Sequence, residues 1–80
     1  MISLTLEKAI VGKDYMVDHL SSGFIQSKLI EMGLFKGQSV TLVFKAPFGG
    51  PIAVNVGGYL LSLRLDEACM VVIHPKHTNH

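Results

Sequence analysis

Apolar and polar residues alternate along much of the second half of the chain, which is the pattern of half-buried strands. The alternation is clearest over residues 38–46. There Val40, Leu42 and Phe44 share one face, which we expect to point inward, and the residues between them point outward. This segment is therefore predicted to be a strand on one side of the core.

A hairpin is predicted directly after this strand. The same alternation recurs over residues 52–56, and a second β-like run covers residues 59–63. Gly57 and Gly58 separate the two runs, and a two-residue hairpin loop favours glycine because both of its positions need positive φ. A last strand is expected over residues 69–74, after a turn or single helical turn that includes Asp66, Glu67 and Ala68.

The best helix candidate covers residues 24–32. Gly33 follows it, at the position where a residue in a left-handed conformation often ends a helix. Ser21 or Ser22 is expected to cap the N-terminus by accepting a backbone hydrogen bond. The apolar residues recur at spacings of three and four, as they do on a helix face: Phe24, Ile25, Leu29 and Met32.

The first twenty residues carry weaker signals. Residues 14–20 fit a strand, whereas residues 4–12 fit either a short strand or one helical turn, and both remain open. The prediction is thus mainly β, with about five short strands and one short helix after the first of them. So few strands cannot fill two packed layers, and a sheet that curls into a small barrel also hides its edges.

Length and composition limit the classes of function. A length of eighty residues predicts one domain and excludes a two-domain enzyme. The hydrophobic content of 49% excludes a disordered chain. The longest uninterrupted apolar run, residues 68–73, is far shorter than the roughly 20 residues of a membrane-spanning helix. A domain of this size buries only about 60% of its unfolded surface. The apolar surplus therefore suggests a surface for a partner or for a second copy of the chain.

Charge and cysteine content limit the expected partners and the expected cellular compartment. Seven basic against six acidic residues make nucleic acid an unexpected partner, because phosphate contacts need Lys and Arg. One cysteine, Cys69, cannot form an internal disulfide, and it is expected to be a small buried strand residue. With no recognisable leader at the N-terminus, we expect a cytoplasmic protein.

Several turn and strand signatures resemble those of the FeoA family in their order and spacing. They are residues 28–34 (KLIEMGL), Gly37, residues 46–52 (APFGGPI), residues 58–64 (GYLLSLR) and Glu67-Ala68. Lys36 stands where many members have proline, and Gln26-Ser27 stand where many have basic residues. The resemblance implies one SH3-like domain over residues 1–74, with residues 75–80 expected to be a flexible tail.

The resemblance also implies a function. FeoA-like proteins are cytosolic, are not known as enzymes, and are thought to act with the ferrous iron transporter FeoB, which has a cytosolic GTP-binding domain. We therefore expect a non-enzymatic accessory protein, with membrane contact only through that transporter at the inner face of the cytoplasmic membrane. No cofactor is required in this hypothesis, and no catalytic grouping of nucleophile, base and orienting residue is readable in the sequence.

Two segments are predicted to contact the partner. One is the loop formed by Pro47, Phe48, Gly49, Gly50 and Pro51, in which two prolines and two glycines constrain the chain around one aromatic side chain. Phe48 either folds onto the core or is offered to a partner. The other segment is the helix 24–32, whose five apolar residues cannot all face the core.

The alternative function is a metal-binding sensor or chaperone. His74, His77 and His80 are spaced three apart near the C-terminus, and imidazole is a common ligand of transition metals. Pro75 argues against a helix there, so that weak metal binding by a flexible tail is the most that we expect.

Overall fold

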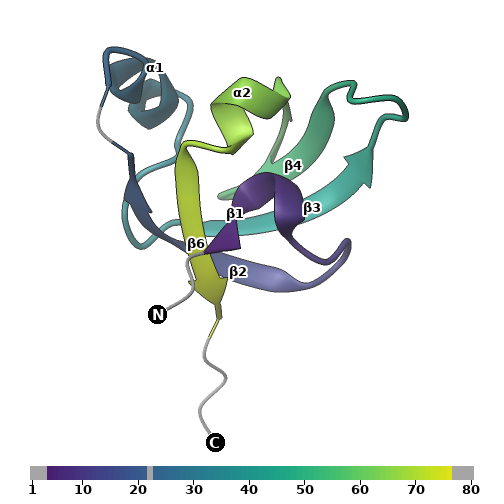
Figure 1. Ribbon diagram of the computed structural model, residues 1–80. Coiled ribbons are helices and arrows are strands. Elements are labelled where there is room, and N and C mark those ends of the chain that lie inside the picture. Colours follow the sequence, from purple (N-terminus) through teal and green to yellow (C-terminus); the bar gives the residue numbers. More distant parts are fainter. Residues whose placement is uncertain (1–3, 22, 77–80) are drawn as a thin grey trace, which may run out of the picture.

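The structure, a computed structural model, describes residues 4–21 and 23–76. The strands form one antiparallel sheet with the strand order β1-β6-β2-β3-β4-β5 (Figure 1). In chain order the elements are β1 (Leu4–Thr5), the 3-10 turn η1 (Leu6–Lys8), β2 (Asp14–Leu20), α1 (Gln26–Glu31), β3 (Ser39–Lys45), β4 (Ile52–Val56), β5 (Tyr59–Leu63), α2 (Leu65–Ala68) and β6 (Val71–Pro75).

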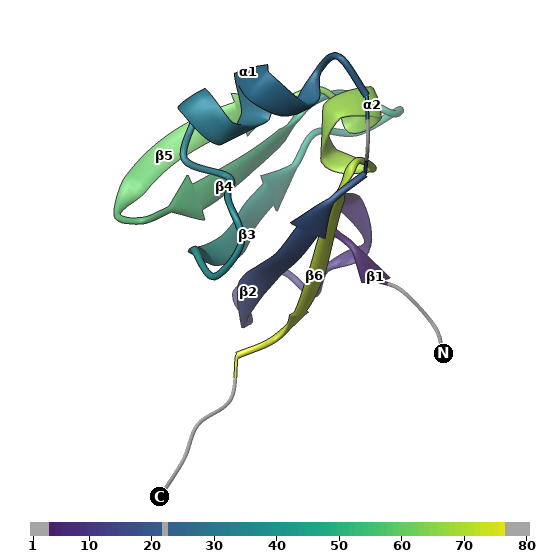
Figure 2. The same ribbon diagram turned by 90° about the vertical axis from the view of Figure 1, so that its left-hand side faces the viewer.

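The sheet curls on itself (Figures 1 and 2), and the buried apolar side chains form one core cluster. The core draws on β2, β3, β4, β5 and β6, together with two side chains from the η1 region and one each from α1, the loop after it and α2. The side chains with no exposed surface at all are Leu6, Leu29, Leu34, Leu42, Val54, Leu63, Ala68 and Val71. The prediction of a mainly β fold built on a small curled sheet is confirmed, with six strands in place of about five.

The predicted hairpin is present. Val56 pairs with Tyr59 across a loop of Gly57 and Gly58, whose φ values are 55° and 94°. Both positions therefore need the left-handed region that glycine enters at little cost.

A bulge reverses one predicted strand face. The register of β3 against β4 shifts between Leu42 and Phe44, so that an extra residue lies in β3 at this point. Residues after a bulge point to the opposite face from the one that strict alternation gives. Phe44 is accordingly 58% exposed, and its expected inward orientation is wrong.

The helix α1 is shorter than predicted and has a different start. Its N-cap is Ile25, without a side-chain hydrogen bond, whereas Ser21 donates its backbone N–H to Met70 O of the loop before β6. The predicted cap at Ser21 is therefore wrong, and Ser22 lies outside the described residues. Gly33 has φ 99° and ends the helix as predicted.

Both ends of the described chain contain regular structure. Residues 4–12 contain both alternatives, a two-residue strand and then a single 3-10 turn. At the other end, Pro75 still pairs with Tyr15, and Lys76 N–H donates to Asp14 O at 3.2 Å. Pro75 thus belongs to β6 and Lys76 makes a backbone hydrogen bond to β2, although we expected both in the tail. No helix in the described part of the chain has the length and apolarity needed to cross a membrane.

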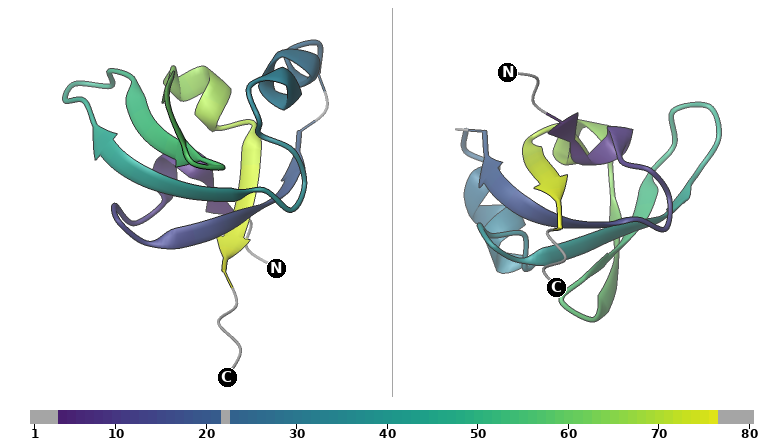
Figure 3. Two further views of the ribbon diagram at one scale, coloured as in Figure 1. Left: turned by 180° about the vertical axis from the view of Figure 1, so that it is seen from behind. Right: turned by 90° about the horizontal axis from the view of Figure 1, so that it is seen from below.

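Three segments gather at one end of the molecule. Figures 1 and 3 show α2 between α1 and the loop that joins β3 to β4. The hairpin tip of β4 and β5 points away from that loop (Figure 2). This arrangement places the two predicted contact segments on either side of α2.

Candidate partner-binding surface

The loop between β3 and β4 is a tight turn with an aromatic residue at its tip. Gly50 N–H donates to Pro47 O at 3.2 Å, and Ala46 N–H donates to Pro51 O at 3.0 Å. The two central residues, Phe48 and Gly49, have φ values of 59° and 73°. Positive φ at both central positions is the mark of a type I′ turn.

Phe48 is the one non-glycine residue with positive φ in the described part of the chain. A left-handed conformation disfavours an L-residue by roughly 1–2 kcal/mol. The ring recovers none of this by packing, because Phe48 is fully exposed, at 104% of its reference area. The alternative in which Phe48 folds onto the core is therefore wrong. An aromatic residue that strains the backbone and buries nothing suggests a functional requirement.

Gly50 keeps this turn tight. A Cβ built at Gly50 would lie 2.9 Å from Ala46 Cβ and 3.2 Å from Pro47 O. Real Cβ atoms essentially never approach another heavy atom within 3.0 Å, and 3.2 Å is tighter than most real Cβ contacts. A side chain at residue 50 would therefore force the two ends of the turn to shift apart.

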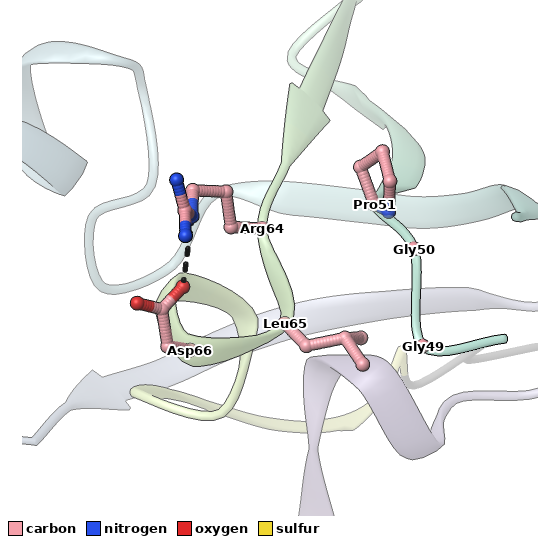
Figure 4. A pocket seen from close by; sticks show the side chains of 6 residues that line it. All are labelled: Gly49, Gly50, Pro51, Arg64, Leu65 and Asp66. Carbon is pink, nitrogen blue, oxygen red and sulfur yellow. Dashed lines mark ion pairs between the residues drawn. The ribbon is translucent and has the colours of Figure 1, made fainter.

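An open hollow lies beside the turn, as Figure 4 shows. Gly49, Gly50 and Pro51 form one wall, and Arg64, Leu65 and Asp66 at the start of α2 form the other. Arg64 Nε lies 3.5 Å from Asp66 Oδ1 in an exposed ion pair. The hollow thus combines apolar lining from Leu65 and Pro51 with one charged pair at its rim.

The predicted contact residues of the helical segment divide into three groups. Phe24 is fully exposed, at 102%. Ile25 and Met32 are half-buried and pack against the core. Leu29 has no exposed surface, so its assignment to the partner surface is wrong: it is the residue that anchors α1 to the core.

A second hollow, which the sequence pattern did not predict, lies next to α1. It is lined by Leu20, Ile30 and Phe35, with His19, Gln26 and Lys36 around them. Ile30 is 47% and Phe35 45% exposed. The signal for Ile30 was its place immediately after Leu29, because neighbouring helix positions point in different directions. Phe35 lies beyond the predicted helix and gave no such signal.

An ion pair connects α1 to α2. Lys28 Nζ donates to Glu67 Oε2 at 2.7 Å, and the other carboxylate oxygen accepts the Arg64 backbone N–H at 2.9 Å. Glu67 is buried, and the hydrogen bond from Lys28, followed by the one from Arg64, holds the pKa of its carboxyl below the ordinary value. The pair fixes α1 relative to the wall of the first hollow.

The described residues offer little to a metal ion. His74 is exposed on β6 and its Nδ1 lies 3.3 Å from Asp18 Oδ1, while His19 Nδ1 lies 2.6 Å from Asp18 Oδ2. The hydrogen bond with His19, more than the nearby His74, lowers the pKa of Asp18. No group of three or more possible ligands occurs within residues 4–21 and 23–76. His77 and His80 lie outside the described residues, so weak metal binding by the tail stays a prediction.

Cys69 differs from its prediction. It is exposed at the C-terminal end of α2, where its Sγ donates to Asp66 O at 3.2 Å, and it does not lie in the last strand. The expectation of a buried strand residue is therefore wrong.

Comparison with known proteins identifies the family. The FeoA domain matches residues 4–75. A FeoA-like protein from Clostridium acetobutylicum is 28% identical with a TM-score of 0.83, and the match covers 100% of this chain and 96% of that one. Iron(II) transport protein A from Clostridium thermocellum is 29% identical with a TM-score of 0.84, over 90% of this chain but only 45% of that chain. A search of curated proteins finds no match.

A third structure supports the fold class. FeoA from Stenotrophomonas maltophilia is 32% identical with a TM-score of 0.77, and the match covers 89% of each chain. It was solved in complex with zinc and is described as an SH3 domain protein and a candidate activating factor of bacterial ferrous iron transport. Family, fold and coverage agree: this chain belongs to the FeoA family, which is associated with ferrous iron transport.

Proposed function

We propose that this protein is a non-enzymatic accessory protein of ferrous iron uptake that binds the cytosolic part of a FeoB-type transporter. The observation that carries the proposal is Phe48, a fully exposed ring on a strained turn. Aromatic side chains are enriched among the few residues that dominate protein–protein affinity. In this cytoplasmic protein, contact with the membrane occurs only through the transporter.

The contact surface consists of the β3–β4 loop, the hollow beside it and Phe24. Phe48 inserts into an apolar pocket of the partner, and the hollow lined by Leu65 and Pro51 receives a side chain in return. Phe24 makes a second aromatic contact beyond α2. Binding modulates transport by favouring one transporter state, which requires unequal affinities for the states.

Binding of the purified cytosolic domain of the transporter tests this proposal. We expect Phe48→Ala to weaken binding at least tenfold, as for an interface hot spot. Phe24→Ala is expected to weaken it less, because that contact is peripheral to the hollow.

Tyr59→Ala is the matched control, because Tyr59 is 76% exposed at the opposite end of β4 and β5. Equal losses for Phe48→Ala and Tyr59→Ala would contradict the proposed surface. The absence of wild-type binding, together with normal iron uptake in a deletion strain, would contradict the function itself.

A further inference from the structure

The strand β5 forms an edge of the sheet. It pairs with β4 and has no second neighbour among the described residues, as the strand order and Figure 2 show. The opposite edge, β1, is only two residues long. A free edge of five residues can template pairing with another strand.

This edge lacks the usual protection. Proteins commonly blunt an edge strand with lysine, proline, an inward charge or a bulge. The segment Tyr59–Leu63 (YLLSL) has no charged residue and no proline, and its register against β4 runs without a shift. Tyr59 is 76% and Leu60 67% exposed, so the edge also presents apolar side chains. The hairpin that carries it projects from the body of the molecule (Figure 3).

The backbone groups that face outward follow from the hairpin. The residues that flank a two-residue loop, Val56 and Tyr59, form a hydrogen-bonded pair, and such pairs alternate along antiparallel strands. Tyr59, Leu61 and Leu63 therefore direct their N–H and C=O groups toward β4. Leu60 and Ser62 direct theirs away from the sheet.

We propose that this edge pairs with the same edge of a second copy, antiparallel about a two-fold axis at Leu61. In this register Leu60 faces Ser62 of the second copy, which gives four hydrogen bonds from the four outward residues. Leu61 then faces its own equivalent. A two-fold contact pairs identical surfaces, so that charged residues near the axis would repel their equivalents. The segment Tyr59–Leu63 has no charged residue and avoids this repulsion.

The alternative registers satisfy fewer groups. A shift that placed Ser62 opposite Ser62 would bring Leu60 opposite Arg64, whose N–H is already bound by Glu67 at 2.9 Å. A shift that placed Leu60 opposite Leu60 would bring Ser62 opposite Gly58, whose N–H donates to Asn55 Oδ1 at 3.2 Å. Only the axis at Leu61 uses all the outward groups.

The dimer is expected to be weak and reversible. We expect the interface between one pair of five-residue strands to bury less area than the roughly 1,200–2,000 Å² of stable interfaces. Sedimentation of the full chain should therefore show a concentration-dependent mass between about 0.01 and 1 mM. Ser62→Pro removes an outward donor and leaves the pairing with β4 intact, and it should keep the protein monomeric over this range.

Cysteine cross-linking tests the register. In a Cys69→Ser background, Leu61→Cys should form an intermolecular disulfide, since facing residues of a non-hydrogen-bonded pair have Cα atoms about 4.5 Å apart. Tyr59→Cys is the control: it is more exposed but faces Leu63 of the second copy, so it should cross-link at least tenfold more slowly. Circular dichroism confirms that both variants fold.

Three results would overturn the proposal. They are a constant monomer mass at 1 mM, equal cross-linking of the two cysteine variants, or protection of the outward Leu60 and Ser62 amides from hydrogen exchange only when the transporter domain is added. The last result would assign the edge to a strand of the transporter. Because β5 lies away from Phe48, failure here leaves the proposed function standing.

Discussion

Phe48 occupies a turn position that glycine or asparagine would occupy at lower cost. Phe48→Gly should therefore fold at least as stably as the wild type, with a gain of up to about 1 kcal/mol, because relief of the left-handed strain exceeds the entropy that glycine adds to the unfolded chain. Phe48→Ala keeps the strain and should change the free energy of unfolding by less than about 0.5 kcal/mol. Urea denaturation measures both. A loss of 3 kcal/mol or more on truncation to alanine is the signature of a core ring and would contradict the exposed one.

At Gly50, in the same turn, we expect a substitution to destabilise the protein. Gly50→Ala should destabilise the protein by about 1–3 kcal/mol, because its Cβ would lie 2.9 Å from Ala46 Cβ. The double variant Ala46→Gly/Gly50→Ala removes that contact and should recover part of the loss, the 3.2 Å approach to Pro47 O remaining. Thermal unfolding compares the two. Equal melting temperatures for Gly50→Ala and the wild type would show that the turn is looser than described.

The stability that the ion pair between α1 and α2 contributes is expected to depend on pH. Glu67 has a lowered pKa in the folded state, so its contribution to stability is present above its ordinary value of 4.5 and is lost as the pH falls through the lowered folded value. Lys28→Met should therefore destabilise the protein by about 1–3 kcal/mol at pH 7, because the buried carboxylate loses its cation, and by much less once Glu67 is protonated. Urea titrations at several pH values give this difference.

A double-mutant cycle separates the pair from the side chains themselves. In a Glu67→Gln background, Lys28→Met should change the free energy of unfolding by less than about 0.5 kcal/mol. The amide oxygen of glutamine can still accept the Arg64 N–H that Glu67 accepts at 2.9 Å. A Lys28→Met effect that is independent of both pH and Glu67 would mean that the ion pair contributes nothing to holding α1.

Elements with local signals could be predicted from the sequence, and features set by long-range pairing could not. The hairpin at Gly57-Gly58 and the helix end at Gly33 follow from backbone conformations that glycine favours. Phe44 points outward because of a bulge in β3 against β4. No residue of β3 indicates this bulge in the sequence. In the short helix α1, spacing grouped Leu29 with exposed residues, because it cannot tell which side of a six-residue helix meets the core.

The candidate site as a whole shows the same division. The β3–β4 loop could be predicted, since two prolines and two glycines around Phe48 indicate a constrained turn. The second wall of the hollow could not be predicted, because the curl of the sheet brings Arg64, Leu65 and Asp66 next to the loop. Phe24 and Phe48 are the most exposed of the large apolar residues, and Tyr59 and Leu60 at the edge of β5 follow them.

At the scale of the whole molecule, charge predicts how partner binding responds to salt. The formal net charge is +1, and Arg64 and Asp66 at the hollow largely compensate each other. With apolar anchors and no net field to steer association, the Kd for the transporter domain should change less than about threefold between 50 and 500 mM salt, and association should proceed at about 10⁵–10⁶ M⁻¹s⁻¹. Asp66→Asn provides the control, because it leaves Arg64 uncompensated and should introduce a salt dependence that the wild type lacks. Surface plasmon resonance at several salt concentrations measures both rates, and a steep loss of wild-type affinity with salt would show that charge, and not the exposed phenylalanines, dominates the contact.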